Sequence, residues 1–174
     1  MNSEPVTVYL GLGSNLGDRQ QNLEKALDYL KQRLQSAEVS SVYETEPIGS
    51  PGQPYFLNMV LRANTRLAPT ELLLLAKGIE RKLGRLPDRR NAPRPIDIDI
   101  LFYGDQVIKT TELIIPHPRL TKRAFVLVPL AEIAPDLVHP TRKRSIKQLL
   151  KGLSGRQGVV KWPPGKEAEC TRLL

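Results

Sequence analysis

The chain has 174 residues, 40% of them hydrophobic and 25% charged, which is ordinary for a soluble globular domain, and no apolar run reaches the about 20 residues of a membrane helix. The net charge of +8 suggests nucleic-acid binding, but residues 141–174 hold nine basic and two acidic residues, so this tail carries +7 and the rest is nearly neutral. A single cysteine, Cys170, excludes an intrachain disulfide, and because the first residues do not form a signal peptide we expect a cytoplasmic protein without a membrane segment.

The start of the chain predicts a strand and then a helix. Residues 6–12 are β-branched and apolar and run into glycines. From Gly11 to Gly17 the spacing is G-x-G-x-x-x-G, which differs from the dinucleotide-binding fingerprint and favours a tight strand-to-helix turn over direct phosphate contact. Asp18 suits the helix cap, and apolar residues at helical spacing extend the helix to about residue 35.

The middle of the chain predicts two strands, a long loop and a second helix. Residues 37–44 and 56–65 have strand patterns. Between them, residues 45–54 include three prolines and two glycines, and loops of this length are usually functional or disordered. The second helix begins at Pro69 and is ended by Gly84.

The fourth strand, residues 95–101, carries two aspartates. Side chains alternate along a strand, so Asp97 and Asp99 share one face while isoleucines occupy the other, and the carboxylates stand about 6.6 Å apart along the strand. Four arginines precede this strand: Arg85, Arg89, Arg90 and Arg94. A solvated strand face is the alternative, but carboxylates beside arginines suit Mg²⁺ and polyphosphate.

The element order β-α-β-β-α-β predicts an α+β fold of the ferredoxin-like type, an antiparallel sheet with both helices on one face and the other face free for a site. After it, residues 106–109 and 113–115 suggest short extended pieces, and 125–134 fit a helix or a strand equally. We expect residues 1–140 to form the domain and 141–174 a basic extension with a short helix over 145–153, followed by loosely ordered sequence.

Several kinds of chemistry are excluded. The chain has no Walker A motif, no protein-kinase signature and no evident serine or cysteine triad. Two histidines, His117 and His139, are too few for a histidine-rich metal site. The hard carboxylate ligands favour Mg²⁺ over zinc.

A set of short motifs resembles the 6-hydroxymethyl-7,8-dihydropterin pyrophosphokinase family of folate biosynthesis, over residues 6 to about 140. In order, they are Gly11-x-Gly-Ser-Asn-Leu-Gly17, Tyr43-x-Thr-x-Pro47, Phe56-Leu-Asn58, Gly84-Arg85, Pro93-Arg94-x-Ile-Asp-Ile-Asp99, and Pro116-His117 followed by Arg123-x-Phe125-x-Leu-x-Pro-Leu130. The family has the ferredoxin-like fold.

The resemblance implies an ATP-dependent pyrophosphokinase that transfers the pyrophosphoryl group of ATP to the hydroxymethyl oxygen of the pterin and releases AMP. It implies two Mg²⁺ ions on Asp97 and Asp99, and catalytic roles for these aspartates with Arg85 and Arg94. The resemblance also implies a monomer with ATP and a reduced pterin as its small-molecule partners. The residues that it implies for ATP binding are Glu80, Arg85, Arg94, Ile100, Leu113, His117 and Arg123. Those that it implies for pterin binding are Thr45, Pro47, Ile48, Phe56, Asn58 and Phe125.

Some of these assignments have alternatives. Core packing is the ordinary role of Phe56 and Phe125, and a surface-helix glutamate that of Glu80. The sequence departs from the family pattern at Asn91, where the family commonly has tryptophan, and the loop is one residue shorter. How this loop closes over ATP is therefore not given by the resemblance. Two rival functions are another ATP-dependent phosphotransferase on this fold and an RNA-binding module with a basic tail, although the third strand lacks the aromatic pattern of an RNP1 segment.

Overall fold

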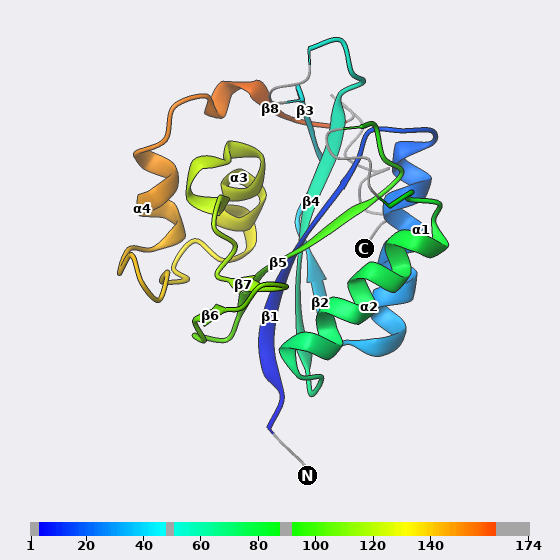
Figure 1. Ribbon diagram of the computed structural model, residues 1–174. Coiled ribbons are helices and arrows are strands. Elements are labelled where there is room, and N and C mark those ends of the chain that lie inside the picture. Colours follow the sequence, from blue (N-terminus) through cyan, green and yellow to red (C-terminus); the bar gives the residue numbers. More distant parts are fainter. Residues whose placement is uncertain (1–3, 48–50, 88–91, 163–174) are drawn as a thin grey trace.

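The computed structural model describes residues 4–47, 51–87 and 92–162. Its centre is an antiparallel sheet in the order β5-β1-β4-β3-β8, with β2 also paired to β4 (Figure 1). The strands are β1 (Val6–Ser14), β2 (Gln35–Val39), β3 (Tyr43–Thr45), β4 (Phe56–Thr65), β5 (Asp97–Tyr103) and β8 (Val159–Lys161), and a separate hairpin joins β6 (Ile108–Lys109) to β7 (Ile114–Ile115).

Two helices cover one face of the sheet, as the sequence predicts. They are α1 (Arg19–Arg33) and α2 (Pro69–Lys82), and the side chain of Asp18 accepts the main-chain N–H of Gln21 at the start of α1. Leucines at helical spacing on α1 pack against Val8, Leu10 and Leu12 of β1 in the larger core. The ferredoxin-like α+β prediction is therefore confirmed.

The opposite face is covered as well, contrary to the expectation that it stays free. Residues 125–134, for which the sequence left helix and strand open, form most of α3 (Ala124–Ile133). This helix packs on Tyr9, Val60 and Phe102 of the sheet and forms a second core with α4 (Ile146–Lys151). Figure 1 shows α3 and α4 on the side of the sheet away from α1 and α2.

Two further expectations need correction. The strand predicted over 37–44 is two strands, because the chain leaves β2 after Val39 and joins β4 again only at Tyr43. The sequence after the short helix was expected to be loosely ordered, but Val159–Lys161 forms β8 and pairs with β3. The described part of the extension therefore adds a strand to the sheet and a helix to the second core.

No helix within the described ranges is long and apolar enough to cross a membrane. Predictions for Ile48, Arg89, Arg90, Asn91 and Cys170 fall outside the residues that the structure describes.

Candidate active site

Three neighbouring strands bring the predicted residues Asp97, Asp99 and Asn58 to one face of the sheet. Gly13 of β1 pairs with Asp97 of β5 on one side and with Asn58 of β4 on the other, and Gly11 pairs with Asp99. Because paired residues in a sheet point to the same face, Asp97, Gly13 and Asn58 form one row. The outer two lie two strand spacings apart, or about 10 Å.

A cavity of about 820 Å³ opens over this row. Its floor includes Gly11 and Gly13, which have no side chains to fill the space, whereas Tyr9 on the same face packs into the core under α3. The glycine-rich segment is therefore mainly strand and not a turn, and only Gly17 has positive φ, at 71°. Among the lining residues are the predicted Thr45, Phe56, Asn58, Arg85, Arg94, Asp97, Asp99, Arg123 and Phe125.

At the acidic end, arginines from the segment before β5 contact Asp97. The Nη1 of Arg85 donates to Asp97 Oδ1 at 2.6 Å and to Glu80 Oε2 at 2.5 Å. Glu80 is almost fully buried, and its Oε2 also accepts the main-chain N–H of Ile98 at 2.9 Å. Arg94 Nη1 lies 3.5 Å from Asp97 Oδ2. In this structure Glu80 therefore fixes Arg85 and the start of β5.

Asp99 lies farther along the same face, where Arg123 Nη1 and His117 Nε2 each stand 4.0 Å from its Oδ2. Burial and the negative charge of Asp97 together raise the pKa of Asp99 to about 7. Two carboxylates held this close repel each other, so a bound cation stabilises their ionised forms.

His117 presents one ring nitrogen to Asp99. The main-chain N–H of Arg119 donates to its Nδ1 at 3.2 Å, so in the neutral ring Nε2 carries the proton. Burial, with the positive charge of Arg123, lowers the pKa of His117 to about 4, and the ring is neutral at pH 7. His117 can therefore donate a hydrogen bond to an oxygen without adding charge.

The other end of the row is built around a buried amide. The Nδ2 of Asn58 donates to Thr45 Oγ1 at 2.7 Å, and both residues are buried. A Cβ on Gly13 would lie 2.7 Å from Asn58 Oδ1, closer than real Cβ contacts allow, so this orientation of the amide depends on glycine. The amide can both donate and accept, as the polar edge of a flat heterocycle requires.

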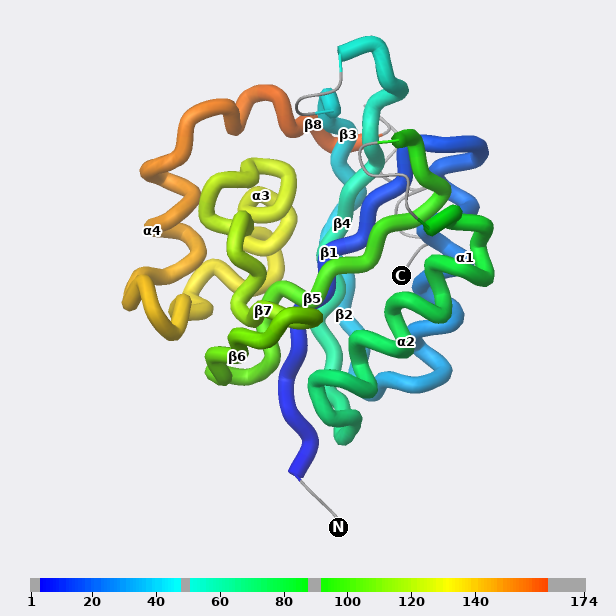
Figure 2. Tube along the Cα trace, in the orientation of Figure 1, coloured from blue at the N-terminus to red at the C-terminus, as the bar shows by residue number. Residues whose placement is uncertain are grey.

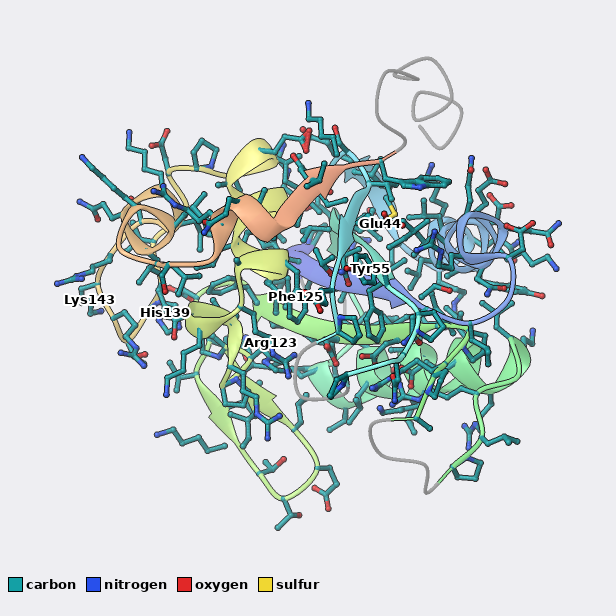
Figure 3. All side chains as sticks on the ribbon, turned by 90° about the horizontal axis from the view of Figure 1, so that it is seen from above. Glu44, Tyr55, Arg123, Phe125, His139 and Lys143 are labelled. Carbon is teal, nitrogen blue, oxygen red and sulfur yellow. The ribbon has the colours of Figure 1, made fainter. Side chains whose placement is uncertain are left out.

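Two phenylalanines line the same cavity as this amide, each beside an arginine. Arg94 lies over the ring of Phe56 at 5.7 Å, and Arg123 over the ring of Phe125 at 5.4 Å. Figure 3 shows Arg123 and Phe125 together at the start of α3, with His139 and Lys143 on the far flank. Phe125 also packs against the second core, so core packing and a place in the cavity wall coexist in this residue.

The comparisons with known proteins agree with this arrangement. Residues 9–135 match the family described as 7,8-dihydro-6-hydroxymethylpterin-pyrophosphokinase (HPPK). The chain is 48% identical over 143 residues to a 2-amino-4-hydroxy-6-hydroxymethyldihydropteridine pyrophosphokinase of Aquifex aeolicus, covering 82% of this chain and 89% of that one. It is also 48% identical over 156 residues to the enzyme of that name from Bacillus subtilis, covering 88% and 89%.

The chain belongs to the HPPK family. It is accordingly an enzyme, a pyrophosphokinase, as its resemblance to this family implies. A solved Plasmodium falciparum HPPK-DHPS structure has the same fold, with a TM-score of 0.71 at 20% identity, and covers 87% of this chain and 43% of that one. The folic acid synthesis protein FOL1 of Dictyostelium discoideum is 39% identical over 164 residues, which is 94% of this chain and 25% of that protein.

Asp97 and Asp99 are the candidate carboxylate ligands for a divalent cation in this cavity. The described residues include no group of three or more histidines, cysteines, aspartates and glutamates that could hold a metal ion. Mg²⁺, however, is usually bound through one or two carboxylates together with water and substrate phosphates. Asp97 and Asp99 fit this pattern, since they share one cavity wall and their mutual repulsion favours a cation.

The predicted ligand-binding residues Ile100, Leu113 and Pro47 do not line the cavity. Ile100 and Leu113 are buried in the larger core and are not among the residues that line the cavity. Pro47 is half-buried at the end of the described part of its loop. Their contacts with ligand remain predictions.

Sequence reasoning missed the roles of three residues here. Arg119 and Lys122 line the cavity, and Asn15 is fully buried and hydrogen-bonded to the backbone of Arg94. Glu46, within the expected pterin segment from Thr45 to Ile48, also lines the cavity. Arg119 directly precedes the short turn Leu120–Lys122 and Lys122 ends it, and the position of both residues between His117 and Arg123 was the available signal. Asn15 gave a weaker one, an asparagine inside the glycine-rich segment that no turn pattern required.

Proposed function

We propose that the protein transfers the β,γ-pyrophosphoryl group of ATP to the hydroxymethyl oxygen of 6-hydroxymethyl-7,8-dihydropterin and releases AMP. The observation that supports this proposal is the row Asp97–Gly13–Asn58, in which a carboxylate and a buried amide lie about 10 Å apart in one cavity. Family membership supports the same reaction.

The pterin is proposed to lie at the Asn58 end. Its polar edge pairs with the amide of Asn58, which Thr45 holds in place, and its faces contact Phe56 and Phe125. Backbone groups from Thr45 to Ile48 are the proposed further contacts, of which Ile48 falls outside the described residues. The hydroxymethyl group then points along the row toward Asp97.

The triphosphate is proposed to lie at the other end, among Arg85, Arg94 and Arg123, with neutral His117 as a hydrogen-bond donor. Planar guanidinium groups match phosphate oxygens in pairs. The Nε of Arg94 is buried and has no hydrogen-bond partner among the described residues, which suits a phosphate oxygen. Glu80 contributes by holding Arg85. The base is proposed to contact Ile100 and Leu113.

Two Mg²⁺ ions on Asp97 and Asp99 are part of the proposal, and when bound they neutralise charge on the phosphates. The hydroxymethyl oxygen forms a bond to the β-phosphorus, the bond from that phosphorus to the α–β bridging oxygen breaks, and the hydroxyl proton leaves to solvent. The arginines stabilise the charge that develops on the departing AMP and on the transferred group. A monomer in the cytoplasm remains the expectation from sequence.

The test removes one carboxylate at a time without changing shape. Asp97→Asn and Asp99→Asn are each expected to lower AMP formation at saturating ATP and Mg²⁺ by at least about a hundredfold, the usual scale for a group that stabilises transition-state charge. Asp105→Asn is the matched control, since Asp105 is exposed in the turn that follows the same strand. Wild-type rates in either site variant, both folded, would refute the metal assignment.

A further inference from the structure

Asn15 is a fully buried asparagine that lies between two segments of the site. It follows β1 directly, beyond the last residue of that strand, Ser14. Its neighbours in space are the end of the loop that leads into β4 and the end of the segment that leads into β5. Figure 2 shows these three stretches meeting at the end of the sheet opposite the amino terminus.

The main-chain N–H and both polar side-chain atoms of Asn15 have partners in these segments. Its main-chain N–H donates to the carbonyl of Arg94 at 3.1 Å, and its Oδ1 accepts the main-chain N–H of Arg94 at 2.8 Å. Its Nδ2 donates to the carbonyl of Pro54 at 3.2 Å and to Gln53 Oε1 at 3.2 Å. A carbonyl only accepts and a main-chain N–H only donates, so the chemistry of the partners fixes the orientation of the amide.

The two segments carry different halves of the reaction. Pro54 precedes Phe56 by two residues, and Phe56 lines the pterin end of the cavity. Arg94 precedes Asp97 by three, and its guanidinium lies between Asp97 and the ring of Phe56. The amide of Asn15 thus fixes the backbone of a phosphate-side arginine relative to the backbone beside a pterin-side aromatic ring.

We propose that Asn15 is a positioning residue that joins the pterin half and the triphosphate half of the site. The inference rests on the proposed function. It assigns to Asn15 the alignment of the hydroxymethyl oxygen with the β-phosphorus, because that alignment needs Phe56 and Arg94 in one fixed relation. It also makes the binding of the two substrates mutually dependent, since whichever ligand orders one segment orders the other through the same amide.

A merely structural role is the rival explanation, and Asn22 supplies the matched control. The Nδ2 of Asn22 donates to the carbonyl of Leu16 at 2.9 Å and to Ser14 Oγ at 3.3 Å. It therefore supports the same turn between β1 and α1, and its hydrogen bonds reach neither site segment. Asn22→Ala should lower stability and leave the alignment of the substrates intact.

The experiment compares wild type, Asn15→Ala, Asn15→Asp and Asn22→Ala. The aspartate variant keeps an acceptor for the N–H of Arg94 and the size of the side chain, and in its ionised form it cannot donate to Pro54, so it is a second variant that breaks the contact with the pterin-side loop. For each, kcat and the KM for the reduced pterin are measured from AMP formation. The Kd of the pterin is then measured with and without Mg²⁺ and α,β-methylene-ATP, which resists transfer.

We expect Asn15→Ala to lower kcat about a hundredfold, the usual effect of an error of about 1 Å in alignment. Its KM for the pterin should rise about tenfold if only about a tenth of the molecules keep the pterin-side loop in place. In this variant the nucleotide analogue should lower the Kd of the pterin by a smaller factor than in wild type. Asn15→Asp should show the pterin defect with a smaller loss in kcat, and Asn22→Ala neither.

The proposal is overturned if Asn15→Ala and Asn15→Asp change only the melting temperature, as Asn22→Ala does. Hydrogen exchange gives a readout that needs no catalysis: amides of residues 53–56 and 92–96 should exchange faster in Asn15→Ala than in Asn22→Ala, and equal rates would contradict the proposal. A wild-type protein that makes no AMP would instead refute the proposed reaction, and the exchange comparison would still decide the role of Asn15.

Discussion

Replacing Gly13 by alanine tests how the pterin end of the cavity is built. The added Cβ would lie 2.7 Å from Asn58 Oδ1 and 3.5 Å from Phe56 Cδ1. Ordinary contacts begin at 3.4 Å, so the amide oxygen must move by 0.7 Å or the strand must shift. Such a movement disturbs the 2.7 Å hydrogen bond from Asn58 to Thr45 and the edge that faces the pterin.

The expected loss of pterin affinity in Gly13→Ala follows from the free-energy cost of leaving a buried polar group without a good partner, about 1–3 kcal/mol. If that cost falls on binding, the Kd for the pterin rises by a factor of about 5 to 150. The nucleotide site is built on Asp97, Asp99 and the arginines, so the Kd for the ATP analogue should stay within about twofold, in the range of experimental scatter for an untouched site.

Gly11→Ala is the matched control, because Gly11 lies two residues earlier on the same face and also lines the cavity. There the added Cβ would meet Leu101 at 3.5 Å, an ordinary contact. Pterin and nucleotide affinities of both variants can be measured by titration calorimetry, with thermal melts to confirm folding. Wild-type pterin affinity in Gly13→Ala, or an equal loss of pterin affinity in Gly11→Ala, would contradict the proposed role of Gly13.

Three other predictions use other parts of the structure. Arg85→Ala should lower the free energy of unfolding by about 1.5–3 kcal/mol, because it removes a charged hydrogen bond from buried Glu80, while exposed Arg81→Ala should change it little; equal denaturant midpoints would contradict this. A chain ending after Pro140 should be less stable than one ending after Trp162, because it loses β8 and fully buried Ile146, whose burial alone contributes about 1.5–3 kcal/mol; equal melting temperatures of the two chains would refute the role of α4. Burial and the charge of Arg142 lower the pKa of His139, so the neutral ring stabilises the fold above the unfolded-state pKa of about 6.5, and stability falls as the pH drops below that value. The variant His139→Asn keeps an acceptor for the main-chain N–H groups of Thr141 and Arg142 and does not titrate, so its melting temperature should fall less between pH 7.5 and pH 5. An unchanged dependence of the melting temperature on pH would contradict this prediction.

Much of the fold could be predicted because the alternation of apolar residues and the residues that begin or end helices are local features of the sequence. The isoleucine–aspartate alternation of β5 gives its buried and open faces directly, and Asp18, Pro69 and Gly84 mark helix ends. The break between β2 and β3 was missed because residues 40–42 have strand-like composition, and only pairing with β4 shows that they leave the ladder. Strand β8 was missed because Val159–Lys161 is too short to stand out without its partner β3.

The site was predictable where a residue type was unusual in its element. Asp97, Asp99 and Asn58 all disfavour strands and therefore called for an explanation. Gly13 and Asn15 were not predictable in their roles, because these depend on contacts across 45 and 79 residues of sequence, with Asn58 and Arg94. The burial of Glu80 was likewise invisible, since an acidic residue on an amphipathic helix normally faces solvent.

The most direct test of the proposed reaction is the identity of the nucleotide product. Full-length protein is incubated with ATP labelled in the γ-phosphate, Mg²⁺ and 6-hydroxymethyl-7,8-dihydropterin, and the products are separated by chromatography. We expect AMP and a labelled pterin diphosphate in equal amounts, and neither product when the pterin is left out. ADP with a pterin monophosphate would show a simple kinase, and ATP consumption that does not depend on the pterin would contradict the proposed substrate.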